Sequence, residues 1–305
     1  MSVESDLLDG MRAGKAFDID RSLLIASGLT SESDIQSYKR KLDEIHQRFQ
    51  AKINDKAGLN RVLDDAQRER KDYRFLIDDP HILAGFLLHR FLYEDKPERY
   101  NSEFLFHRVI DNQLSEETQL VGNCLGLSCL YHALGNRMGL TTNPIIVTRE
   151  GYNHVLLHQT TSQGNSAPVE STMGDGFNYC EERGREGDSV DLVNELYVSR
   201  WKRAEEPDEQ LRLADISLRL RPDDVNILVW RTGKRIERGN MQGAYEDASR
   251  AIMVDPCDIA LLRYAQYLER TGNIDEATRY ARIAQSVAPD FKPATDFLSR
   301  LEQKR

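Results

Sequence analysis

Three residues in the middle of the chain have the types that thiol chemistry requires. Cys124 follows Gly122 and Asn123 at the start of an apolar, helix-like run, and His154 and Glu170 come later in strand-like sequence. A thiol at a helix N-terminus meets the positive end of the helix dipole and the unpaired amide groups of the first turn. Such a position favours a thiolate and supplies donors for an oxyanion. The three residues therefore predict a nucleophile, a base and a group that orients the base.

The two strand-like runs set the expected geometry of this site. We expect strands at 154–159 and 169–172 that pair as antiparallel neighbours about a midpoint near residue 163. This register puts Glu170 on the same face as His154 and within diagonal reach of it. Cys124 is then the nucleophile, His154 the base and later the acid, and Glu170 fixes the imidazole tautomer. The Cys124 amide, with a neighbouring side chain, would bind the oxyanion.

Simpler structural roles compete with this interpretation. A free cysteine usually packs as a small hydrophobe, and Cys129 lies among leucines where core packing is expected. A zinc site at Cys124, Cys129 and His132 is rejected because offsets of five and three do not place all three on one helix face. We predict neither a metal nor a cofactor. The remaining cysteines and histidines are expected to be structural, with Cys180 in a loop, Cys257 in a repeat core, His158 a satisfied polar residue, and His46, His81, His89 and His107 on helices without partners.

Length and composition limit the class of protein. The 305 residues suggest roughly two domains, and the formal charge of −9 gives no electrostatic reason to expect nucleic acid or an anionic membrane as partner. No apolar window approaches the roughly 20 residues that span a bilayer. The N-terminus is acidic and lacks a signal peptide, and the four cysteines do not look like a disulfide framework. A reducing cytoplasm is the expected location.

Residues 1–120 form the first predicted region, which is helical and packs on the core. Thr30 or Ser31 caps a helix with apolar residues three or four apart, and further helices are expected at 59–75, 80–93 and 100–112.

Residues 121–203 form the second predicted region, an α+β core. A helix starts at Asn123 and ends at Gly139, and strands follow at 145–148, 154–159 and 169–172. A charged, glycine-rich loop is expected at 180–188 and a helix at 190–201. The order of elements predicts the α+β class.

Residues 204–305 form a repetitive third region. Small or turn-forming residues recur 33 residues apart, at Gly239, Ala244, Ala248, Ala251 and Pro256 and again at Gly272, Ala277, Ala281, Ala284 and Pro289. Small residues at these spacings allow two helices to pack closely. The pattern resembles tetratricopeptide repeats, and the last helix would be the polar terminal cap of such an array.

Four short motifs resemble the transglutaminase-like superfamily. They are Gly122–Ser128, Gly139-Leu140, Asn153-His154-Val155 and Val169–Thr172. More closely, the chain resembles bacterial transglutaminase-like proteins with a helical N-terminal region and C-terminal tetratricopeptide repeats. The resemblance implies a papain-like fold and a catalytic triad of Cys124, His154 and Glu170. It departs from the family pattern at Leu125, where a Trp is usual, and at Glu170, where Asp is common, with Asp175 as a nearby substitute.

Two functions follow from these expectations. The first is a cysteine amidohydrolase or acyltransferase that acts on a protein or peptide amide. The second is a non-catalytic transglutaminase-like scaffold whose repeats bind a partner protein or peptide. Both functions are compatible with repeats that deliver a substrate protein to the site.

Overall fold

The computed structural model describes residues 3–12, 18–149, 152–178 and 184–303, and it divides into two compact units, 1–199 and 200–305. The fold mixes helices with a small antiparallel sheet and ends in an all-helical stretch, so it belongs to the α+β class. Within the described residues, no helix has both the length and the apolar character needed to cross a membrane.

Helices make up most of the first unit. They are α1 (Val3–Arg12), α2 (Ile19–Ala26), α3 (Glu32–Asn54), α4 (Lys56–Glu69), α5 (Tyr73–Asp78), α6 (Pro80–Glu94), α7 (Phe106–Leu114), α8 (Cys124–Arg137) and α9 (Ser189–Arg203). Ser31 caps α3, as predicted, and accepts a hydrogen bond from Asp34 N. The single helix predicted at 59–75 is wrong. Arg70 leaves the helical path and bonds to Asp72 at 2.9 Å and to the carbonyl oxygen of Asp175 at 3.2 Å, which separates α4 from α5.

The sheet contains β1 (Thr142–Arg149), β2 (Tyr152–Thr160), β3 (Ser166–Val169) and β4 (Arg185–Glu186) in the order β3-β2-β1-β4. The β2–β3 pairing runs from Thr160 opposite Ser166 to Leu157 opposite Val169, which confirms the predicted midpoint near residue 163. The predicted strand at 169–172 is wrong, because the amide of Glu170 donates to Gly176 O and turns the chain out of the ladder. The loop expected at 180–188 also contains β4, which pairs with β1.

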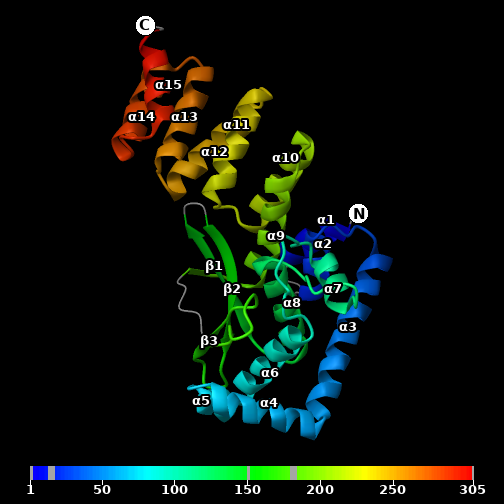
Figure 1. Ribbon diagram of the computed structural model, residues 1–305. Helices are drawn as coiled ribbons and strands as arrows, with labels where there is room; N and C mark the ends of the chain where they lie inside the picture. The colour runs from blue at the N-terminus through cyan, green and yellow to red at the C-terminus, as the bar shows by residue number, and fades with distance from the viewer. Residues whose placement is uncertain (1–2, 13–17, 150–151, 179–183, 304–305) are drawn as a thin grey trace. The chain divides into compact units, whose positions relative to one another are not determined.

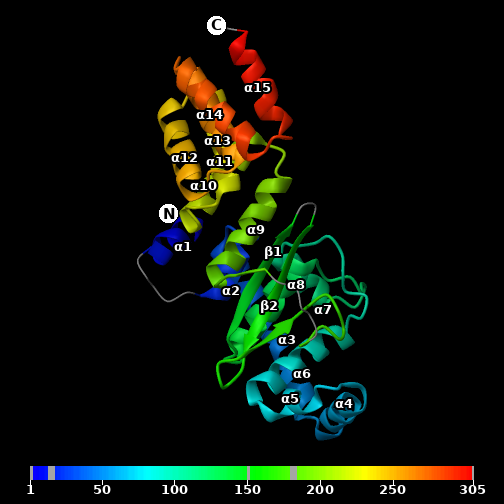
Figure 2. The ribbon, with the colours of Figure 1, turned by 90° about the vertical axis from the view of Figure 1, so that its left-hand side faces the viewer.

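Helix α8 is the central element of the first unit. All of its residues from Leu125 to Gly135 are buried, and it packs against β2 and β1, as Figures 1 and 2 both show. Two polar contacts fix its position on β2. Ser128 Oγ donates to Val155 O at 3.1 Å, and Tyr131 donates to Gln159 Oε1 at 2.6 Å. The helix therefore cannot slide along the strand without breaking buried hydrogen bonds.

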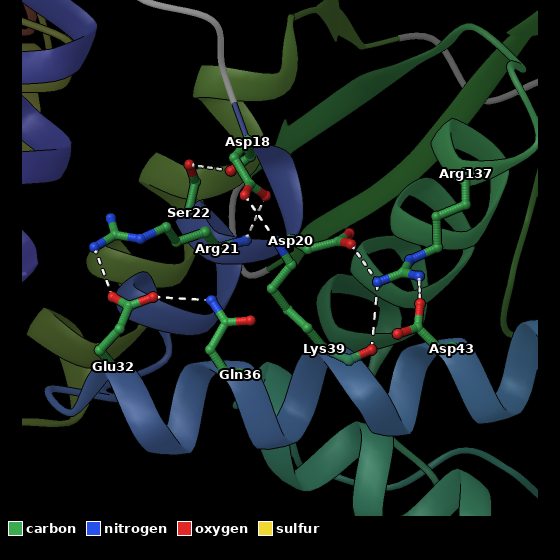
Figure 3. Close-up of polar contacts among 9 residues, drawn as sticks. All are labelled: Asp18, Asp20, Arg21, Ser22, Glu32, Gln36, Lys39, Asp43 and Arg137. Atoms are coloured by element: carbon green, nitrogen blue, oxygen red, sulfur yellow. Dashed lines mark hydrogen bonds and ion pairs between the residues drawn. The ribbon is translucent and has the colours of Figure 1, made fainter.

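The C-terminal end of α8 is held by ion pairs with α2 and α3. Arg137 forms an ion pair with Asp20 at 2.6 Å and also contacts Asp43. Figure 3 draws both contacts. Burial raises the pKa of Asp20 although Arg137 opposes the rise. Gly139 has a φ of 75°, the left-handed conformation that was expected to end the helix. Both ends of the helix that begins with Cys124 are thus anchored.

The second unit is entirely helical where it is described. It contains the last residues of α9 and then α10 (Pro207–Leu220), α11 (Val225–Glu237), α12 (Met241–Val254), α13 (Asp258–Arg270), α14 (Ile274–Val287) and α15 (Lys292–Glu302). The pairs α11–α12 and α13–α14 begin 33 residues apart and have matching lengths of 13 and 14 residues. Gly239 and Gly272 have φ values of 74° and 84° at the equivalent turns. The repeat in the sequence is therefore also a repeat of backbone geometry.

Candidate active site

Cys124 is the first residue of α8. Asn123 caps the helix by accepting a hydrogen bond from Gly126 N at 3.0 Å, and its own amide donates to Glu103 O at 2.6 Å. The residue is partly exposed rather than sealed in the core. The amide groups of Cys124 and Leu125 lie in the first turn, where no intrahelical carbonyl accepts them. The position therefore combines an accessible thiol with unused backbone donors.

Two glycines flank the cysteine because another helix passes close by. A Cβ atom on Gly126 would lie 2.7 Å from Val109 Cγ2 on α7, and one on Gly122 would lie 2.9 Å from the same atom. Real Cβ atoms do not approach so closely, so a side chain at either position would force Val109, or the main chain near Glu103, to shift. Close packing at Gly122 and Gly126 therefore holds the segment around the thiol in place.

His154 lies on β2 opposite Val147 and contacts both other members of the predicted site. Its Nε2 is hydrogen-bonded to Glu170 Oε2, and Cys124 is close enough to the imidazole to raise its pKa. Because Nε2 is bonded to the carboxylate, we infer that Nδ1 is the ring nitrogen that exchanges a proton with the sulfur. The structure thus brings Cys124, His154 and Glu170 together in the order sulfur, imidazole, carboxylate.

Glu170 lies just beyond the end of β3, and its second oxygen is also held. Glu170 Oε1 accepts hydrogen bonds from the amide of Thr172 at 2.9 Å and from its hydroxyl at 2.6 Å. Burial favours the neutral acid, but the hydrogen bonds from His154 and Thr172 outweigh burial and lower the pKa of Glu170. The carboxylate is therefore charged at neutral pH and fixed at both oxygens. Thr172 was not predicted to act in this way.

The charge state of His154 follows from the same contacts. Burial alone would lower the pKa of its imidazole, but hydrogen bonds and charge interactions with Cys124 and Glu170 raise the pKa to about 10. The side chain is only 11% exposed, so solvent screens these interactions weakly. At neutral pH the ring is an imidazolium between two acidic groups. This is the form that can donate a proton to a leaving group.

A buried histidine lies directly behind the carboxylate. His89 Nε2 donates to the main-chain oxygen of Glu170 at 3.0 Å, and burial lowers the pKa of His89 to about 4. The ring is enclosed by Tyr131 and Phe177. A neutral histidine in this place fixes the backbone of Glu170 without adding charge. The expectation that His89 lacks a partner is wrong, because helical sequence alone does not reveal which strand a helix will meet.

The other sequence candidates lie apart from this cluster. Cys129 is fully buried in the core, as predicted, and burial raises its pKa. Asp175 is exposed and does not replace Glu170. Cys257 is partly exposed at the start of α13, and Cys180 lies outside the described residues.

The remaining histidines also have local contacts. His132, a residue of the rejected zinc set, contacts Thr142 and Ser189. His46 contacts Gln50, and His107 contacts Ser27 at 3.0 Å. The expectation that His46 and His107 have no partners is therefore wrong. Over the described part of the chain, no group of three His, Cys, Asp or Glu residues is arranged to hold a metal ion.

Comparison with known proteins adds no family to this picture. No protein-family model matches the chain, and no curated protein matches it significantly.

Proposed function

We propose that the chain is a thiol-dependent amidohydrolase or acyltransferase of transglutaminase-like type. Cys124 is the nucleophile, His154 the acid and base, and Glu170 the residue that orients His154. The observations that support this proposal most strongly are the hydrogen bond between His154 and Glu170 and the effect of Cys124 on the pKa of the same imidazole, at the N-terminus of a buried helix. The substrate is a protein or peptide amide, and a reducing cytoplasm would keep the thiol active.

The first half of the reaction forms a thioester. The Cys124 thiolate attacks the amide carbon, an S–C bond forms, and the carbonyl π pair moves to the oxygen. The unpaired amides at the start of α8 stabilise the resulting oxyanion. When the intermediate collapses, the C–N bond breaks, and the leaving nitrogen takes the proton of the His154 imidazolium.

The second half of the reaction releases the acyl group. Water or an acceptor amine attacks the thioester while the now neutral His154 removes its proton. The S–C bond breaks, the sulfur leaves as thiolate, and the imidazolium is restored. Glu170 keeps Nε2 protonated throughout, because its Oε2 accepts from that nitrogen. Neither half needs a metal or a redox partner.

Covalent labelling tests this assignment without a known substrate. We expect a diazoketone analogue of glutamine to add to Cys124 and to leave Cys129 unmodified, because Cys129 is buried. Mass spectrometry of proteolytic peptides identifies the modified residue. Cys257, which is partly exposed at the N-cap of α13, provides the rate of another thiol at a helix N-terminus in the same sample. Equal labelling of Cys124 and Cys257 would count against a nucleophilic role.

A second candidate function, partner binding by the C-terminal repeats, rests on one unusual arginine. The second unit has a hollow of about 560 Å³ lined by α11, α13 and α15, and Arg263 lies in it. Arg263 donates to Gln266 Oε1 at 2.7 Å, and no carboxylate of the described residues lies within ion-pair distance of it. Burial lowers the pKa of Arg263, although the charge of Glu237, which lines the same hollow, opposes the fall. In contrast, Asp247 and Asp215 raise the pKa of Arg231 despite burial. We propose that Arg263 binds the C-terminal carboxylate of a partner peptide.

Fluorescence polarisation with two peptide pools tests the second candidate. One pool of random heptapeptides has free C-terminal carboxylates, and the other has C-terminal amides. We expect the free-acid pool to bind the full chain more tightly and Arg263→Ala to weaken it by about tenfold or more, the loss of a charge-assisted pair. Arg238→Ala, at an exposed pair with Asp208, is the matched control. Equal binding of the two pools contradicts this function.

A further inference from the structure

Tyr100 lies on a loop that the backbone ties to the segment before the nucleophile. It forms a parallel bridge with Gly122, which precedes Cys124 by two residues. On one side of it the amide of Asn101 donates to Gly122 O at 3.1 Å, and on the other Arg99 O accepts from Gly122 N at 3.1 Å. The position of the Tyr100 Cα relative to the thiol is thus set by backbone hydrogen bonds rather than by side-chain packing.

The side chain of Tyr100 is unusually open for an aromatic residue in such a fixed segment. It is 58% exposed, and among the described residues its hydroxyl has no hydrogen-bond partner. Partial burial raises the pKa of Tyr100, and the charges of Cys124 and Glu170 raise it further, so the phenol keeps its proton at neutral pH. The backbone bridge to Gly122 therefore places an unused donor on the loop next to the segment that leads into α8.

The oxyanion donors described so far are backbone amides at the start of α8. A second kind of donor, from a side chain, cannot be Leu125, which follows Cys124 and has no donor atom in its side chain. We propose that the Tyr100 hydroxyl is the second oxyanion donor and therefore a catalytic residue that touches the substrate. This inference rests on the proposed acyl-transfer function and names a residue that the sequence did not indicate.

The step in which Tyr100 acts is the addition of the thiolate to a carbonyl carbon. The S–C bond forms, the π pair of the C=O bond moves to oxygen, and the phenol hydrogen-bonds to that oxygen without transferring its proton. A peptide aldehyde undergoes the same addition and stops at the hemithioacetal, whose oxygen occupies the oxyanion position. Alkylation by iodoacetamide instead displaces iodide from a saturated carbon and forms no oxyanion.

These two reagents separate the donor role of Tyr100 from the reactivity of the thiol. We expect Tyr100→Phe, which removes only the hydroxyl, to weaken binding of acetyl-leucyl-leucyl-norleucinal by about ten- to a hundredfold, the usual effect of one hydrogen bond to a charged oxygen. The rate of Cys124 alkylation by iodoacetamide should stay within about twofold of wild type, since no oxyanion forms. Tyr245→Phe, at another exposed tyrosine, is the control and should change neither value.

The outcomes distinguish failure of this inference from failure of the proposed function. The inference is overturned if Tyr100→Phe binds the aldehyde as tightly as the wild type does. If Tyr100→Ala alone loses affinity, the ring makes an apolar contact with the aldehyde and the hydroxyl is not the donor. The acyl-transfer function itself is overturned if the wild type does not bind the aldehyde and its Cys124 reacts with iodoacetamide no faster than Cys257 does. Circular dichroism of both variants confirms folding, which an exposed side chain should not disturb.

Discussion

Replacement of Glu170 by glutamine is expected to slow acylation of Cys124 by about three orders of magnitude while the fold is kept. In the wild type, both donors of Thr172 bond to Glu170 Oε1, and Oε2 accepts from His154 Nε2. In the variant, the same Thr172 donors hold the amide oxygen, so the amide nitrogen faces the imidazole. Nε2 must then accept, the ring proton moves to Nδ1, and the nitrogen facing the sulfur can no longer take a proton. Release of nitrophenolate from p-nitrophenyl acetate measures the rate.

A second substitution tests the reason for this loss. In Glu170→Gln with Thr172→Val, the hydroxyl is lost and the backbone amide of residue 172 is left to hold the amide oxygen, so the glutamine can turn its oxygen toward His154 more easily. We expect the double variant to be acylated at least about tenfold faster than Glu170→Gln, because the correct tautomer becomes accessible again. A Glu170→Gln rate within tenfold of wild type would show that the carboxylate does not control the imidazole.

The imidazole of His154 is expected to titrate near pH 10 rather than near its ordinary value. Cys124 and Glu170 raise the pKa of His154 to about 10 against the opposing effect of burial. Because the pKa in the folded state is raised, the imidazolium is still present at neutral pH and is lost as the pH rises through about 10. Amide cleavage needs that proton, so its rate should fall on the same alkaline limb.

Nuclear magnetic resonance of the ¹⁵N-labelled ring follows this titration directly. In Glu170→Gln the midpoint should move to lower pH, because a negative charge and an acceptor that favour the imidazolium are removed. His89 provides an internal contrast, since its pKa is lowered to about 4 and it should stay neutral across the range. A His154 midpoint near 6.5, unchanged by the Glu170 substitution, contradicts the assigned contacts.

Local signals in the sequence predicted the fold where neighbouring residues decide the structure. Ser31 begins α3, Gly139 follows α8, and the 33-residue repeat gives paired helices of matching length. The errors lie where distant contacts override local preference. The break between α4 and α5 depends on Arg70 bonding to a loop more than 100 residues away, and such a contact leaves no periodic pattern.

Local signals in the sequence also predicted part of the candidate site. Cys124 and His154 stand at a helix start and on a strand, which the sequence shows. Glu170 was predicted to lie on a strand, but β3 ends one residue before it, at Val169. Its approach to His154 therefore depends on the turn in which Glu170 N donates to Gly176 O, and not on cross-strand pairing. His89 and Tyr100 reach the site from a helix and a loop whose own sequences contain no motif. Tertiary contacts identify them, since His89 bonds to the main-chain oxygen of Glu170 and the backbone of Tyr100 pairs with Gly122, two residues before Cys124.

The central claim is that the His154 imidazole activates the Cys124 sulfur. The second-order rate of Cys124 alkylation by iodoacetamide at pH 7, compared between the wild type and His154→Ala, measures this activation directly. We predict that Cys124 reacts faster than Cys257 in the wild type. In His154→Ala, Cys124 should react at least about tenfold more slowly than it does in the wild type, because the thiolate loses its charge partner. An unchanged Cys124 rate in His154→Ala would contradict the account.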